Sequence, residues 1–275
     1  MNLPGFDYAC PATLDEALTL LDADPEARAL AGGQTLIPTL KQRLTRPSML
    51  VDLRRIPELR GIEVSASHVT IGAMTRHAET AAHAGLRAAI PALSHLAGGI
   101  AHPQVRHMGS MGGSVANNDP AADYPAAVLG LGAVIETTRR KIPADAFFLG
   151  LFETALEPGE LVLRFRYPIP RRAGYHKIAS QASGYVTTGC FIADTGTGIR
   201  VAVNGAGPCA FRQRDFEAAL TAAFAPAALA GLVQPAAGLN SDMHASADYR
   251  AHLVGVAARR ALDMALRQAE TEKTA

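Results

Sequence analysis

Tryptophan is absent from the 275 residues, and only 5% of them are aromatic. Cysteine is scarce too: Cys10, Cys190 and Cys209 form no CxxC pair and are too few for the four thiolates of a typical iron–sulfur cluster. No stretch approaches the roughly 18 uninterrupted apolar residues of a membrane helix, and residues 1–10 lack the basic and then apolar pattern of a signal peptide. We therefore expect reduced cysteines in a cytoplasmic protein without a membrane span.

An excess of one charge is missing as well. The chain has 26 Lys and Arg against 25 Asp and Glu, a net charge of +1. That balance predicts no binding to nucleic acid or to an anionic membrane. Apolar residues make up 48% of the chain and charged ones 19%, which is typical of a folded protein with a sizeable core. The length favours two domains.

The residue pattern predicts a mixed α+β region of about 170 residues followed by a smaller sheet-and-helix region. Thr13 and Glu16 have the spacing of a capping box, and Thr35 and Thr75 are expected to cap further helices. The predicted strands are residues 29–31, 49–53, 69–73, 134–138, 161–167, 175–179, 187–193 and 199–203. The predicted helices are 14–21, 36–43, 88–101, 123–131, 214–224 and 247–267. The run Pro-Ile-Pro-Arg-Arg at 168–172 is predicted to mark the boundary between these two regions.

Two glycine-rich segments share one design, Gly-Gly-Gln-Thr at residues 32–35 and Gly-Ser-Met-Gly-Gly-Ser at 109–114. Each combines glycines with small polar side chains and precedes a helix start. Consecutive backbone N–H groups in such a loop can form a nest for anionic oxygens, and a helix N-terminus adds further donors. Together they can hold a diphosphate without lysine or arginine. The alternative is that both are ordinary turns; neither is a Walker A loop.

Other motifs predict little chemistry. Residues 205–210 fit GxGxxA, but no crossover helix follows, so we interpret them as a turn. His95, His102 and His107 match no zinc spacing and are interpreted as surface or capping side chains. No GxSxG elbow is present. Asp119 is expected to cap a helix before Pro120; Asp123 could cap the next helix or accept hydrogen bonds from a ribose hydroxyl.

The chain resembles the FAD-binding medium subunit of the molybdenum hydroxylases, the family of xanthine dehydrogenase, bacterial carbon monoxide dehydrogenase and N-heterocycle dehydrogenases. Residues 31–38 are similar to the first flavin-diphosphate loop of that family, and residues 101–114 to the second. Asp-Pro-Ala-Ala-Asp at 119–123 continues the second motif. Segments at 157–161, 176–178 and 245–250 follow in the family's order, so the resemblance covers nearly the whole chain.

This resemblance implies an α+β fold with two domains. Residues 1–172 would form a two-subdomain FAD-binding domain of the PCMH-like type, with subdomains at about 1–55 and 56–172. Residues 173–275 would form the C-terminal flavoprotein domain of the carbon monoxide dehydrogenase type, an antiparallel sheet plus a helix bundle.

The resemblance also implies which residues bind FAD. Residues 29–36 and 110–114 would wrap the diphosphate, Asn117 and Asp123 would meet ribose and ribityl hydroxyls, and Leu156 and Leu161 would lie near the adenine. Lys177 and Tyr185 would lie near the isoalloxazine ring; the alternatives are a solvated lysine and a packed tyrosine. The full predicted set is Ala29, Leu30, Ala31, Gly32, Gly33, Gln34, Thr35, Leu36, Ile100, Ala101, Gly109, Ser110, Gly112, Gly113, Ser114, Asn117, Asp123, Leu156, Leu161, Lys177 and Tyr185.

The function implied is electron transfer by a subunit that has no metal ligands or catalytic residues of its own. A noncovalent FAD would take single electrons from the [2Fe–2S] clusters of a small partner subunit and pass them to an external acceptor. A large partner subunit with the molybdenum cofactor would oxidise the substrate, in a dimer of heterotrimers. Two other functions stay open, a self-sufficient FAD oxidoreductase acting on a small substrate and a cofactor-free assembly subunit.

The chain departs from the family pattern in a few places. Ser110-Met111 stands where Thr-Ile is common, which keeps a hydroxyl. Residues 183–185 read Ser-Gly-Tyr where Gly-Asp-aromatic is frequent, so an acidic side chain beside the flavin ring is lost. The four-cysteine insert of the benzoyl-CoA reductase branch is missing, so no additional cluster is expected.

Overall fold

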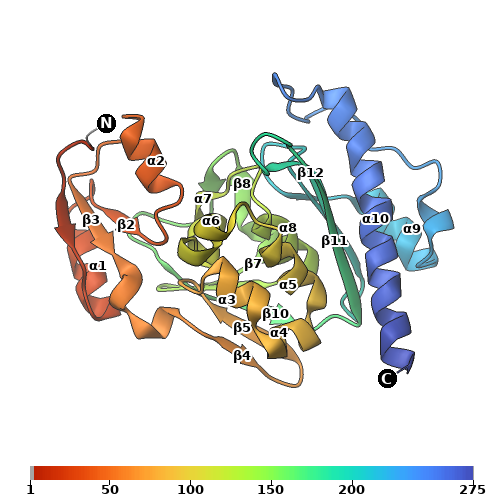
Figure 1. The fold of residues 1–275 in the computed structure, drawn as a ribbon, viewed down its shortest axis with the longest axis horizontal. Coiled ribbons are helices and arrows are strands. Elements are labelled where there is room, and N and C mark those ends of the chain that lie inside the picture. Colours follow the sequence, from red (N-terminus) through yellow and green to blue (C-terminus); the bar gives the residue numbers. More distant parts are fainter. Residues whose placement is uncertain (1–2, 275) are drawn as a thin grey trace.

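A computed structural model describes residues 3–274 of the protein. Three parts follow one another in chain order across Figure 1, from a small N-terminal sheet, through a helix-covered central sheet, to a C-terminal sheet with a long helix beside it. Within the described range, no helix has the combined length and apolarity that crossing a membrane requires.

The N-terminal part is a three-stranded parallel sheet with two connecting helices. Its elements are β1 (Asp7–Ala9), α1 (Leu14–Ala23), β2 (Arg28–Leu30), α2 (Leu36–Lys41) and β3 (Met49–Asp52), and β3 lies between β1 and β2. The predicted capping box is confirmed, because the Glu16 amide donates to Thr13 Oγ1. Helix α2 begins where predicted, but Thr35 makes no side-chain cap bond; its backbone is helical rather than extended as a cap requires.

The central part is a five-stranded antiparallel sheet in the order β4-β5-β10-β6-β7. The strands are β4 (Ile62–Val64), β5 (His68–Gly72), β6 (Val134–Thr137), β7 (Lys141–Pro143) and β10 (Val162–Pro168), with a hairpin of β8 (Phe148–Gly150) and β9 (Glu153–Thr154). The helices between β5 and β6 are α3 (His77–Ala82), α4 (Ala84–Ala89), α5 (Pro91–Gly98), α6 (Pro103–Met108), α7 (Met111–Asn117) and α8 (Tyr124–Leu131). Short 3-10 turns are Leu53–Arg55, Pro57–Leu59 and Ala144–Ala146.

Three predictions in this helical region were wrong. The single helix expected at 88–101 is divided, because Pro91 cannot continue α4 and instead starts α5. Thr75 does not cap α3; its hydroxyl donates to the Gly61 carbonyl. Residues 109–114, expected as a loop, contain the start of α7, with Ser110 as N-cap.

The C-terminal part is a four-stranded antiparallel sheet that is buried on both faces. Its strands, in order, are β11 (Arg172–Ala179), β12 (Val186–Asp194), β13 (Ile199–Asn204) and β14 (Phe211–Arg212). Along β12, Cys190 and Ile192 pack in the cluster with α9 (Arg214–Ala222) and α10 (Ala247–Thr274), while Phe191 and Ala193 join the central core. A short 3-10 helix, Pro226–Leu229, lies between α9 and α10. Residues 205–210 form a turn, as predicted.

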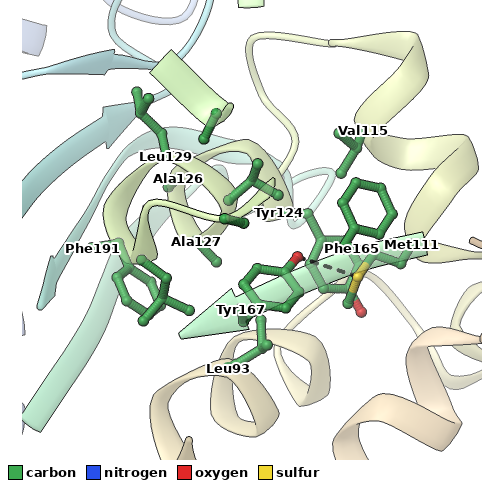
Figure 2. Packing of buried hydrophobic residues seen from close by; sticks show 14 of the residues in the cluster. Leu93, Met111, Val115, Tyr124, Ala126, Ala127, Leu129, Phe165, Tyr167 and Phe191 are labelled. Atoms are coloured by element: carbon green, nitrogen blue, oxygen red, sulfur yellow. Dashed lines mark hydrogen bonds between the residues drawn. The ribbon is translucent and has the colours of Figure 1, made fainter. Parts of the chain in front are cut away.

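The central core joins the helices to both sheets. Every residue of α8 is buried, and α8 approaches β12 so closely that a Cβ on Gly130 would lie 2.8 Å from the Phe191 ring. Figure 2 shows Tyr167 of β10 donating its hydroxyl to Met111 Sδ at 3.3 Å. This bond links the first residue of α7 to the central sheet.

Candidate functional site

A cavity of about 630 Å³ opens where the three parts of the chain meet. Such a volume lies within the range of about 300–1,000 Å³ typical of small-molecule and cofactor sites. Its walls come from the β2–α2 turn, the segment after β5, residues 100–123, the start of β10 and the β11–β12 turn. The predicted cofactor residues that line it are Ala29, Ala31, Gly32, Gly33, Gln34, Thr35, Leu36, Ile100, Ala101, Gly109, Ser110, Gly112, Gly113, Ser114, Asn117, Asp123, Leu161 and Tyr185.

Three of the predicted residues do not line the cavity. Leu30 is buried in the small cluster with Leu40 and Leu50. Leu156 is half-buried against the central core. Lys177 reaches Asp123, which does line the cavity, with its Nζ 2.9 Å from Asp123 Oδ1.

Several lining residues had no signal in the sequence. Ala73, Met74 and His77 follow β5, where no glycine pattern or motif marks a binding segment. His102 also lines the cavity, although it was not among the predicted cofactor residues; it lies in the segment 101–114 that resembles the second flavin-diphosphate loop and occupies the N-cap position of α6 without a side-chain cap bond. Residues 73–77 follow β5, and the pairing of β5 with β10, nearly 100 residues later in the chain, brings them to the site.

The two glycine segments are packed against each other. A Cβ on Gly32 would collide with the Met108 carbonyl oxygen and lie 2.6 Å from the Cα of Gly109. A Cβ on Gly113 would lie 3.3 Å from the Cβ of Ala31. The absence of side chains at these positions therefore allows the two segments to form one continuous surface, besides leaving the backbone open to a ligand.

The first glycine segment presents a row of unengaged backbone donors. Within residues 3–274, the amides of the four consecutive residues 32–35 donate to no acceptor. Gly33 has φ of +70°, in the left-handed region that favours glycine. Consecutive amide donors in such a turn provide the concave, partially positive surface that binds anionic oxygens.

The second glycine segment, residues 109–114, does not offer the free backbone N–H donors that the sequence predicted for it. The first amides of α7 are used inside the protein: Met111 donates to Thr75 O, Gly112 to Ala73 O, and both Gly113 and Ser114 donate to Ser110. A Cβ on Gly112 would lie 2.6 Å from that of Ala73, so this glycine is required for packing. The prediction of free N–H donors at this helix start was wrong; the segment offers small side chains such as Ser114 to the cavity.

Asp123 carries a buried carboxyl whose pKa is raised. Its side chain is buried and makes no cap bond to α8; instead Lys177 Nζ and the Tyr175 hydroxyl each approach Oδ1 at 2.9 Å. Burial raises the pKa of Asp123, while Lys177 and Tyr175 act in the opposite direction. Asp119 likewise caps no helix, because its Oδ1 accepts from the Ala121 amide in a turn.

Lys177 joins three segments around the cavity. Besides Asp123, its ammonium donates to the Gly99 carbonyl at 2.9 Å and to the Gly184 carbonyl at 3.3 Å. The Gly184 contact holds the turn that carries Tyr185, a half-exposed residue on the cavity rim. The side chain of Lys177 is mostly buried, so it is not the solvated lysine of the alternative interpretation.

His77 lies under the second glycine segment. It is buried against Tyr124, with 5.2 Å between ring centroids, and its amide donates to Gly109 O. Burial, with a smaller effect of the Arg106 charge, lowers the pKa of His77 to about 4. The imidazole is therefore neutral at pH 7 and adds no charge to the site.

These features fit a dinucleotide cofactor. The row of free amides suits a diphosphate. The carboxylate and ammonium pair suits hydroxyl groups and a polar ring edge, and Leu53, Leu161 and Val162 give the cavity apolar walls. The fold and the site thus define an α+β protein whose cavity suits a dinucleotide cofactor.

Comparison with known proteins identifies the family. Residues 4–170 match the family model described as the FAD binding domain in molybdopterin dehydrogenase. The carbon monoxide dehydrogenase medium chain of Hydrogenophaga pseudoflava is 36% identical over 95% of this chain and 97% of its own length. The 6-hydroxypseudooxynicotine dehydrogenase complex subunit alpha of Paenarthrobacter nicotinovorans is 34% identical over 99% and 98%.

The fold is shared as well. A solved structure of the Hydrogenophaga pseudoflava carbon monoxide dehydrogenase, in a form lacking the Mo-pyranopterin moiety of its cofactor, superposes with a TM-score of 0.86 at 35% identity. That match covers 97% of this chain and 99% of the other. The chain belongs to the family of FAD-binding medium subunits of the molybdenum hydroxylases, and is thus an oxidoreductase subunit. The α+β architecture expected from the sequence is confirmed.

Proposed function

We propose that the chain is the electron-transfer subunit of a heterotrimeric molybdenum hydroxylase. It holds FAD noncovalently, takes single electrons from the [2Fe–2S] clusters of a small partner subunit and passes them to an external acceptor. A large subunit with the molybdenum cofactor oxidises the substrate. The observation that carries this proposal is the row of four unengaged amides at residues 32–35, which line a cavity that the buried Asp123 also lines. When bound, FAD supplies chemistry that accepts electrons singly and releases them in pairs.

The residues of the chain hold and orient the cofactor. The amides of residues 32–35 bind the diphosphate oxygens, and the Ser114 hydroxyl lies on the same wall. Asn117 and Asp123 take the ribose and ribityl hydroxyls. The Leu161 side chain, with Leu156 behind the wall, forms the apolar surface for the adenine.

At the isoalloxazine end, Lys177 supplies charge and Tyr185 supplies an aromatic surface. The Lys177 ammonium is held by Asp123 and two carbonyls, so its position is determined before the cofactor arrives. A fixed cation there favours negative charge on the ring. Tyr185 lies on the rim, where half of its surface is exposed.

We further propose the division into domains at residues 172 and 173, which coincides with the start of β11, with subdomains at about 1–55 and 56–172. Relatives described as medium chains or complex subunits support an assembly with partners. We infer a dimer of heterotrimers in the cytoplasm, in which this chain contributes neither molybdenum nor iron ligands.

The test uses the full chain purified with FAD and a separately purified [2Fe–2S] subunit of the same complex. The proposal predicts that the reduced small subunit bleaches the flavin absorbance in a stopped-flow experiment, and that small organic substrates without partners do not. Bleaching by a small substrate alone would identify a self-sufficient flavoenzyme instead. A chain that assembles with its partners but never binds FAD would be an assembly subunit.

A further inference from the structure

The loop between α7 and α8 rests on the C-terminal sheet. Three consecutive carbonyls, those of residues 120–122, accept hydrogen bonds from that sheet. The donors are the Gly205 amide at 2.8 Å, the Val186 amide at 3.2 Å and Asn204 Nδ2 at 2.7 Å. Because the same loop lines the cavity, the sheet determines where the loop and Asp123 stand relative to the glycine segments.

Tyr175 completes this contact from behind the cavity wall. It lies on β11, is 2% exposed, and donates its hydroxyl to Asp123 Oδ1. Asn204 Nδ2 in turn lies 3.4 Å from the Tyr175 hydroxyl. Gly189 leaves the space for this pair, because a Cβ there would lie 3.0 Å from the hydroxyl and would collide with Asn204 Oδ1.

The hydroxyl of Tyr175 makes a directed hydrogen bond, which is not required to fill the space that the side chain occupies. A phenylalanine would fill the same volume, and burying a hydroxyl is unfavourable unless it is hydrogen-bonded. Here the bond goes to a carboxylate, the stronger type of acceptor. Tyr175 and Lys177 both use Oδ1 of Asp123, so together they determine the rotation of the carboxylate and the direction in which Oδ2 points.

We propose that Tyr175 is a positioning residue of the cofactor site, which holds the Asp123 carboxylate, and through it the Lys177 ammonium, in the orientation that a hydroxyl-bearing part of FAD meets. This inference rests on the proposed FAD binding. It makes the C-terminal sheet part of the cofactor site, although the sheet follows the segment matched by the family model.

The test is a double-mutant cycle on the affinity of the deflavinated full chain for FAD, measured by fluorescence titration. Tyr175→Phe is expected to raise the Kd about 10-fold, since it removes a hydrogen bond to a charged group. In an Asp123→Asn background the same substitution is expected to change the Kd less than about 2-fold, because the two residues act as one unit. Tyr8→Phe is the matched control, because it removes a tyrosine hydroxyl that donates to a carboxylate, Asp52 Oδ2 at 2.8 Å, and neither residue lines the cavity; its Kd should not change.

An unchanged Kd in Tyr175→Phe would overturn the proposal. So would an equal change of the Kd in the wild-type and the Asp123→Asn backgrounds, which would indicate a structural role for Tyr175. A wild-type chain that binds no FAD would instead overturn the proposed function. If Tyr175→Phe does not fold, Asn204→Ala removes a donor to the same hydroxyl and is expected to raise the Kd about 3-fold; no change there would also overturn the proposal.

The pH profile gives a second readout that a purely structural role would not move. The groups around the Asp123 carboxyl are Lys177 and Tyr175 on β11 and Tyr124 on α8. The Tyr175 hydrogen bond lowers the pKa of Asp123, so its loss should shift the acid limb of FAD binding to higher pH. Identical acid limbs for the wild type and Tyr175→Phe would contradict the proposal.

Discussion

Gly32 and Gly109 meet backbone to backbone, and a Cβ on Gly32 would lie 2.6 Å from the Cα of Gly109. This contact joins two segments that are 77 positions apart into one wall of the cavity. The row of amides at residues 32–35 begins at this contact.

Gly32→Ala should therefore separate the segments. We expect a loss of about 1–3 kcal/mol in the free energy of unfolding, as for other overpacked sites, together with loss of FAD uptake. Urea unfolding and the ratio of FAD to protein after reconstitution measure the two effects. Gly198→Ala is the matched control, because a Cβ there meets nothing within 4 Å. A Gly32→Ala chain with normal stability and full FAD content would contradict this account of the wall.

Asn118 ties α7 to the β8–β9 hairpin. It is buried with φ of +45°, and its Nδ2 donates to the carbonyls of Gly150 and Glu153 at 2.8 and 2.7 Å. Asn118→Ala should destabilise the chain by about 2–4 kcal/mol, because two buried carbonyls lose their donor and alanine disfavours this backbone conformation. Asn118→Gly keeps the conformation and should cost about 1 kcal/mol less. Equal losses of unfolding free energy in Asn118→Ala and Asn118→Gly, measured by urea unfolding, would show that the backbone conformation at this position carries no strain.

The two members of the Asp123–Lys177 pair should respond unequally to neutralisation. Lys177→Met leaves a buried carboxylate without its cation and should cost about 3–5 kcal/mol in the apo chain. Asp123→Asn should cost less, because the ammonium keeps its bonds to Gly99 and Gly184. Urea unfolding at pH 7 measures both. Glu157→Gln weakens two exposed pairs, with Arg139 and Arg140, and should change stability by less than about 1 kcal/mol. A larger loss of unfolding free energy in Asp123→Asn than in Lys177→Met would contradict this prediction.

His77 should make the folded state sensitive to acid. Burial lowers its pKa from 6.5 to about 4, so between these values the unfolded chain binds one proton more than the folded chain. Stability from this residue is complete above pH 6.5 and falls as the pH drops towards 4, by about 2 kcal/mol between pH 7.5 and 5.

The measurement is the free energy of unfolding at both pH values for the wild type and His77→Gln. The variant should lose less stability on acidification than the wild type, by about that amount. His252→Gln, at an exposed position on α10, should behave like the wild type. Parallel pH profiles for all three chains would show that His77 does not titrate as its burial implies.

Much of the framework follows from local pattern. The capping box at Thr13, the turn at residues 205–210 and the strands β10–β13 could be predicted because alternation and capping act over a few residues. Strands β4, β7, β8 and β9 are only two or three residues long and are defined by their partners. Helix α7 contains Gly112 and Gly113, poor helix formers that are accepted because their backbone packs on Ala73 and Ala31.

The site was predictable where a motif marks it. The segments around Gly32 and Gly113 stand out in the sequence, and they do line the cavity. Tyr175 and His77 carry no such signal, since their contacts with Asp123 and Gly109 connect positions 52 and 32 residues apart. The engagement of the α7 amides could not be foreseen either, because it depends on the chain after β5 passing beneath that helix.

The visible absorption spectrum of the purified protein decides whether this chain holds FAD. We expect flavin bands from a cofactor that heat or acid releases into the supernatant, identified there as FAD at about one molecule per chain. A colourless protein that also fails to take up added FAD would contradict it.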